Sequence, residues 1–165
     1  MAKKNTLGIV FLVLAIVGLI LAVVGFGTGV VAAEGESTGL FEDGWDMPGM
    51  PSRTFAILAF IVTLVGAVVV IVHAILGMIG KDIKILGLCG GAVAVIGGIL
   101  VLVAGLVLAS KFSDLINIAS NIGSGMGIDV PKISVSAGIG IWLGLIGGLM
   151  AGVAGILNAL KIGQK

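Results

Sequence analysis

The sequence predicts an all-α membrane protein in which four transmembrane helices form a bundle packed through glycine and other small residues. Three observations predict this fold. Hydrophobic residues make up 59% of the 165 positions and charged residues only 10%, whereas a soluble domain typically has about 25% charged residues. The charges leave four long uncharged windows, and 29 residues are glycine. This composition excludes a soluble globular protein, a disordered chain and a nucleic-acid-binding protein.

The four windows between charged residues contain 29, 27, 26 and 28 residues in chain order. A helix needs about 20 apolar residues to cross the hydrocarbon core of a bilayer, so each window is long enough. Residues 57–72 lack the apolar–polar alternation of strands in a membrane β-barrel. The sequence therefore predicts one integral membrane domain over residues 1–165. Its expected elements are transmembrane helices at 7–31, 55–80, 84–109 and 134–160, an outer loop at 32–54, an inner turn at 81–84 and an outer segment at 110–132.

The distribution of basic residues predicts the orientation of these helices. The side that carries both termini and the 81–84 turn has six lysines, against three basic residues on the other side. Basic residues accumulate on the cytoplasmic side of membrane proteins. We therefore expect a multi-pass protein of the cytoplasmic membrane with both termini inside. The six lysines are Lys3, Lys4, Lys81, Lys84, Lys161 and Lys165, and the other three residues are Arg53, Lys111 and Lys132.

Glycines recur at regular spacing in the third and fourth expected helices. Small residues let helix backbones approach closely in a membrane, where burying leucine gains little. Two interpretations are open: the glycine stripes pack the four helices of one chain, or the fourth helix also contacts a second copy or another subunit. The candidate residues are Gly140, Gly144, Gly148 and Gly152, spaced by four, and Gly91, Gly98 and Gly105, spaced by seven.

Apart from Lys84, the first residue of the third expected span, no Asp, Glu, Lys or Arg lies inside an expected span. Proton pumps, ion-coupled transporters and voltage sensors usually carry such residues at membrane depth, so the sequence disfavours these classes. His73 and Cys89 lie eight residues before and after Lys81, and a tight hairpin would bring them to a similar depth. We expect a neutral histidine hydrogen-bonded to a backbone carbonyl and a cysteine that acts as a small apolar residue. The alternative is a haem or metal site, although neither a cofactor nor a metal is predicted.

The outer loop at 32–54 is acidic and contains several apolar side chains. Phe41, Trp45, Met47 and Met50 are the candidates for contact with a partner. Two thioethers suit Cu(I), but a third soft ligand is missing beside them. The five carboxylates of the loop lack the spacing of a calcium loop. We therefore interpret this segment as a solvated acidic loop that contacts a partner.

The outer segment at 110–132 has an amphipathic pattern. Apolar residues recur at intervals of three and four, as in a helix with one apolar face, and glycines at 123, 125 and 127 are expected to end that helix. We expect a short helix, separate from the third span, that lies along the outer surface or caps the bundle. Its apolar residues are Phe112, Leu115, Ile116, Ala119 and Ile122. Trp142 is expected to fill the bundle or an interface opposite the glycines.

The layout resembles that of the claudin and peripheral-myelin-protein tetraspans. The resemblance rests on Gly39-Leu40-Phe41 and Trp45 in the first outer loop and on the glycine-rich stretch Gly140–Gly148. It implies four helices with cytoplasmic termini. That family has a longer first outer loop with two cysteines, whereas this loop has none, and the order of the tryptophan and the Gly-Leu pair is reversed. The resemblance concerns architecture, and no functional residue is transferred.

These features predict a non-catalytic tetraspan that acts as a structural, accessory or scaffold subunit of a membrane assembly. Its expected partners are the lipid bilayer and other membrane subunits or further copies of itself. Two alternatives remain open: an oligomeric channel or small-solute pore, and a cofactor- or metal-binding subunit that uses His73. An enzyme is not expected, because no nucleophile–base pair or carboxylate pair lies at membrane depth.

Overall fold

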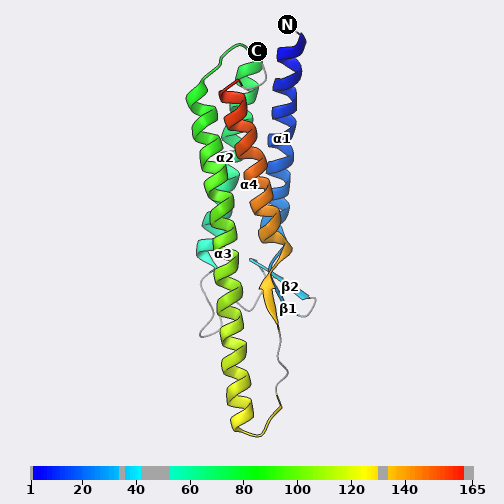
Figure 1. The fold of residues 1–165 in the computed structure, drawn as a ribbon, viewed down its shortest axis with the longest axis vertical. Helices are drawn as coiled ribbons and strands as arrows, with labels where there is room; N and C mark the ends of the chain where they lie inside the picture. Colours follow the sequence, from blue (N-terminus) through cyan, green and yellow to red (C-terminus); the bar gives the residue numbers. More distant parts are fainter. Residues whose placement is uncertain (1, 34–35, 42–52, 130–133, 162–165) are drawn as a thin grey trace.

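The computed structural model describes residues 2–33, 36–41, 53–129 and 134–161. Four helices lie side by side in an elongated bundle (Figure 1). Helix α1 packs against α4 and α2, and α3 packs against α2 and α4. The start of α1 and the end of α4 lie at one end, here named the terminal end, and three short strands lie toward the opposite, sheet end (Figure 1). The helices are α1 (Ala2–Gly27), α2 (Thr54–Met78), α3 (Lys84–Gly125) and α4 (Ile139–Ala159).

All four helices are long and apolar enough to cross a membrane. Large apolar side chains cover their outward faces; Ile20, Ile96 and Val153, for example, are each about half exposed. An apolar surface of this extent is unfavourable in water and favourable in lipid. The chain is therefore a multi-pass integral membrane protein, and its four apolar helices contact the bilayer.

The first span is shorter than expected, because α1 ends at Gly27 rather than near residue 31. Glycines at 25, 27 and 29 weaken the helix there, and the β-branched pair Val30-Val31 enters a strand. Strand β1 (Gly29–Ala33) pairs antiparallel with β2 (Glu36–Gly39) on one side and with β3 (Val135–Ala137) on the other. The prediction of an all-α protein is therefore wrong at the sheet end, although the chain is mostly helical.

Helix α3 is one continuous helix of 42 residues. The expected end near residue 109 and the separate amphipathic helix after it are therefore wrong. No Gly or Pro interrupts the stretch 106–122, so the intrahelical hydrogen bonds continue past the apolar part. The segment 110–125 is about 24 Å long at 1.5 Å per residue. Instead of lying along the surface, it continues the axis of α3 past the sheet (Figure 1).

Two helices end at glycines, as expected for the 123–127 stretch. Gly127 has a φ of +75° after α3, and Gly80 has a φ of +86° after α2. After α3, the Ile128 N–H donates to the Gly123 carbonyl at 2.8 Å, and after α2 the Lys81 N–H donates to the Leu76 carbonyl at 2.9 Å. This six-residue hydrogen bond around a left-handed glycine satisfies carbonyls that the helix itself leaves free. The glycines thus fix where both helices turn.

The buried core changes character along the bundle. Near the sheet end it contains large side chains, among them Phe60, Leu40 and Ile141, all fully buried. Another cluster consists of three alanines, Ala67, Ala94 and Ala151, from α2, α3 and α4. Small side chains at such contacts let helix backbones approach closely. The bundle is therefore held by backbone proximity at the alanines and by a larger apolar cluster near the sheet.

Candidate functional site

One small-residue face of α4 packs against α1. A Cβ atom added to Gly147 would lie 2.5 Å from the Gly18 carbonyl oxygen, and one added to Gly140 would lie 2.5 Å from the Gly25 carbonyl oxygen. Both distances are far below van der Waals contact, so the two backbones touch. The first face of α4 is therefore occupied by a helix of the same chain.

The second small-residue face of α4 packs against α3 and α2. A Cβ atom on Gly148 would lie 2.7 Å from the Ala94 carbonyl oxygen, and one on Gly152 would lie 2.7 Å from the Gly91 carbonyl oxygen. Gly144 faces the ring of Phe60. On α3, Gly98 faces Gly148, and Gly105 faces Ile141. All seven candidate glycines are buried at contacts within one chain: Gly91, Gly98, Gly105, Gly140, Gly144, Gly148 and Gly152.

The structure does not bring His73 and Cys89 together in one site. His73 is 1% exposed, and its ring lies against Gly87, where an added Cβ would be 2.6 Å from Nε2. Cys89 is exposed. The histidine Nδ1 has no hydrogen-bond partner, so the expected bond to a backbone carbonyl is not formed at this atom. Among the described residues, no group of three His, Cys, Asp or Glu side chains is placed to hold a metal ion.

The unpartnered Nδ1 gives a prediction for stability. We expect His73→Leu to raise the free energy of unfolding by about 1–2 kcal/mol, because it removes a buried polar atom without a partner. Unfolding in a detergent titration, followed by circular dichroism, measures the change. Thr63→Val is the matched control, since the Thr63 hydroxyl is equally buried on α2 but donates to the Ala59 carbonyl at 2.9 Å. A loss of stability in His73→Leu would show that the imidazole has a stabilising role.

The first outer loop is described only at its two ends. Leu40 is fully buried, and the next residue, Phe41, is 64% exposed but contacts Phe26 edge-to-face at a centroid distance of 4.9 Å. The Arg53 guanidinium donates to the Leu40 carbonyl at 2.8 Å. This hydrogen bond ties the start of α2 to the end of the β2 segment. The other candidates of this loop, Trp45, Met47 and Met50, lie outside the described residues.

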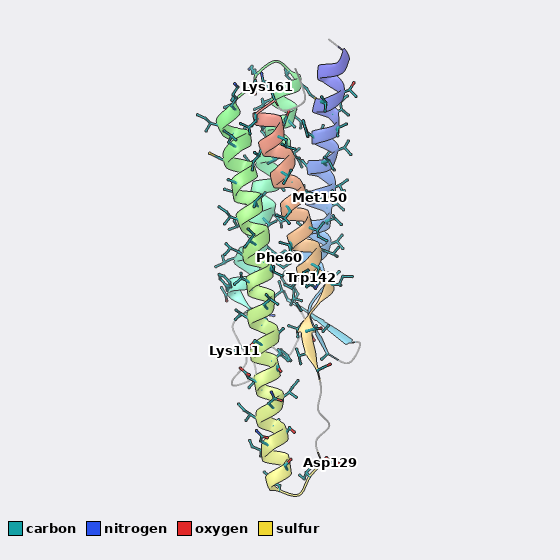
Figure 2. The ribbon with its side chains drawn as sticks, in the orientation of Figure 1. Phe60, Lys111, Asp129, Trp142, Met150 and Lys161 are labelled. Carbon is teal, nitrogen blue, oxygen red and sulfur yellow. The ribbon has the colours of Figure 1, made fainter. Side chains whose placement is uncertain are left out.

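An open groove of about 560 Å³ lies between α3, β3 and the start of α4. Of the two positions expected for Trp142, the inside of the bundle is wrong, whereas an interface opposite the glycines stays a prediction. The residue is 47% exposed and lines this groove, and Figure 2 shows it where α4 adjoins the sheet. Ser110, Ser113 and Asp114 line the α3 side. Their spacing of three and four residues places them on one helix face. That spacing is visible in the sequence, but the pairing of β3 with β1 that completes the groove is not.

The projecting part of α3, residues 110–125, carries large apolar side chains that are only partly covered. Phe112 packs against the core cluster near the sheet. Farther out, Ile118 and Ile122 are 55% and 54% exposed. They are four residues apart, so they lie on the same face of the helix. Of the residues expected on the amphipathic face, Phe112 is partly buried and Ile122 is exposed; Ile118 is a further exposed apolar residue that was not expected there.

At the terminal end, an ion pair joins the α2–α3 turn to the end of α4. The Lys161 ammonium lies 2.5 Å from the Asp82 carboxylate. Lys161 has a φ of +53°, a left-handed conformation that costs a non-glycine residue roughly 1 kcal/mol. The hydrogen bond from Lys161 lowers the pKa of the Asp82 carboxyl, and partial burial opposes this effect. The ion pair thus accompanies a strained backbone at the end of α4.

The lowered pKa of Asp82 makes a small part of the stability depend on pH. A carboxyl whose folded pKa is below its unfolded value stabilises the protein above the unfolded pKa, and the effect is lost as pH falls through the folded pKa. The pair is partly exposed, so we expect Asp82→Asn to cost under about 1 kcal/mol at pH 7. Unfolding in a detergent titration at pH 7 and at pH 3 measures the difference in the free energy of unfolding between Asp82→Asn and the wild type. This difference should be smaller at pH 3. An equal difference at both pH values would contradict this assignment.

No protein-family model, curated protein or solved structure matches the chain. Its function therefore has to be inferred from the arrangement of its own residues.

Proposed function

We propose that the protein is a non-catalytic structural or accessory subunit of a membrane assembly and that the projecting part of α3 binds the partner. The proposal includes the orientation: the sheet end faces outward from the cytoplasmic membrane, and the terminal end faces the cytoplasm. The orientation follows from the lysines on the terminal side, which are twice as many as the basic residues on the other side.

The packing of the bundle supports a structural role. Both small-residue faces of α4 contact helices of the same chain at backbone distances. The proposal therefore assigns association with other copies or subunits to a different surface. The glycine contacts hold the four helices closely together, and the bundle in turn positions the three strands and the projecting part of α3.

The observation that carries the proposal is the exposure of Ile118 and Ile122 on the projecting helix. More than half of each side chain is exposed, and both residues lie more than two helical turns past Ala109, the last buried residue of the apolar part of α3. The proposal places the edge of the hydrocarbon core near Ala109, so that lipid does not cover Ile118 and Ile122. Exposed apolar residues on one helix face typically mark a contact with another protein, because they are unfavourable in water.

Native mass spectrometry on protein extracted gently from its own membrane tests the proposal. We expect extra mass that matches one or more other polypeptides, and we expect the double variant Ile118→Asp, Ile122→Asp to lose it. The matched control is Asn117→Asp, Asn121→Asp, which adds the same charge at neighbouring positions of the same helix segment. Equal companion mass in both double variants would contradict a role for the apolar face. A closed homo-oligomer that conducts ions or solutes would favour the pore instead.

A further inference from the structure

The groove beside Trp142 has two chemically different halves. Leu106 and Trp142 are 52% and 47% exposed and belong to the apolar parts of α3 and α4. Ser110, Ser113 and Asp114 follow Leu106 on α3, toward the projecting end, and Ser136 lies on β3 opposite them. Ala109, Val135 and Ala137 complete the lining, so the groove combines an apolar surface with three hydroxyls and one carboxylate. Its volume is about 560 Å³, and it is open along one side.

The polar half of the groove suits a cation. Among the described residues that line the groove, Asp114 is the charged one, and the serines at 110, 113 and 136 add hydroxyl oxygens. A primary ammonium has three N–H donors, which match a carboxylate and neighbouring hydroxyl acceptors. A quaternary ammonium has no N–H to donate and would use the carboxylate and the hydroxyls less well.

We propose that this groove binds a membrane lipid through a primary ammonium headgroup, of the phosphatidylethanolamine type. Asp114 and the serines receive the ammonium, and Leu106 and Trp142 contact the start of the acyl chains. Leu106 and Trp142 belong to helices that are candidate membrane spans, which favours a lipid over a free amine in solution. This inference goes beyond the structural role proposed above, and it does not depend on which side of the membrane the sheet end faces.

The test uses the full chain purified in a mild detergent and titrated with three lipids that share the same acyl chains. Native mass spectrometry measures binding of phosphatidylethanolamine, phosphatidylcholine and phosphatidylglycerol. We expect phosphatidylethanolamine to bind about tenfold more tightly than the other two, since its N–H donors make hydrogen bonds to a charged acceptor. In the Asp114→Asn variant, phosphatidylethanolamine should bind only as tightly as phosphatidylcholine does. Equal binding of all three lipids to the wild type would overturn the proposal.

Two controls separate the site from unspecific effects. Asp129→Asn removes a carboxylate at the far tip beyond α3 (Figure 2), and it should leave the lipid preference unchanged. Loss of the preference in this variant would mean that net charge, not the groove, selects the lipid, and would overturn the proposal. Soluble phosphoethanolamine identifies the ligand class: displacement of the lipid at equal concentration would show that the groove recognises a free amine, which contradicts a lipid site. Asp114 is exposed, so its variant is expected to fold, and circular dichroism checks this.

Discussion

Gly18→Ala is expected to destabilise the bundle by about 2 kcal/mol, although the substitution adds a single methyl group. The new Cβ atom would lie 2.6 Å from the Gly147 carbonyl oxygen and 2.8 Å from the Ala151 nitrogen. Both atoms belong to the backbone of α4, so they cannot move aside as a flexible side chain can. The contact between α1 and α4 has to open, which lowers the free energy of unfolding in a detergent titration.

Gly8→Ala on the same helix is the matched control, and we expect the opposite sign. A Cβ atom at Gly8 meets nothing within 4 Å. Alanine is a better helix former than glycine by about 1 kcal/mol, so this variant is expected to gain up to that amount. If Gly18→Ala unfolds at the same detergent concentration as Gly8→Ala, the backbone contact between α1 and α4 does not stabilise the fold.

Gly138→Val is expected to detach β3 from β1 and to open the sheet end. A Cβ atom at Gly138 would overlap the Gly29 carbonyl oxygen and would lie 2.8 Å from the Val30 carbonyl carbon. The Gly138 N–H also donates to the Val30 carbonyl at 2.8 Å. The clash therefore falls on the hydrogen bond that holds the two segments together. We expect a local cost of about 3 kcal/mol.

Cysteine crosslinking measures this separation. Ala33 and Val135 are register partners in the pairing of β1 with β3, so Ala33→Cys, Val135→Cys should form a disulfide in a Cys89→Ser background. Gly138→Val should reduce its yield about tenfold or more. Ala33→Cys, Ala137→Cys is the out-of-register control and should crosslink poorly from the start. Unchanged disulfide formation when Gly138→Val is added would contradict the close approach at this glycine.

The sequence was sufficient to predict the four apolar helices, because each uncharged window is longer than the roughly 20 residues that a helix needs to cross a membrane. It also predicted that a helix ends at the glycines 123–127, although it assigned that end to a separate outer helix and not to α3; Gly127 adopts the left-handed conformation there. Both features depend on neighbours in the chain. Local signals of this kind can be interpreted from one sequence without knowledge of the fold.

The sheet end could not be predicted in the same way. The run Gly29–Ala33 is apolar and fits either the end of a span or a strand, and the pairing with residues 135–137, about a hundred positions away, decides between them. The charge windows also mark only where the apolar stretch ends. They gave no reason to expect that α3 continues as a helix beyond Lys111, because a helix does not have to end where the membrane does.

The candidate sites illustrate the same limit. Equal spacing from Lys81 placed His73 and Cys89 at one expected depth, but depth says nothing about direction around the helix axis, and one residue is buried while the other is exposed. For α4, the spacing of the glycines indicated close contacts but not whether the neighbour is the same chain. The groove beside Trp142 requires β3 and α3 together, so no local pattern contained it.

Cysteine labelling along α3 in intact cells tests the central claim most directly. In a Cys89→Ser background, single cysteines at Ile96, Asn117, Asn121 and Ser124 are treated with a membrane-impermeant maleimide; the three outer positions are exposed and lie outside the proposed partner and lipid contacts. A helix that projects outward from the membrane predicts labelling of the three outer positions without permeabilisation and no labelling at position 96. Protection of positions 117, 121 and 124 from the outside would contradict an outward projection of α3 and, with it, the proposed partner surface.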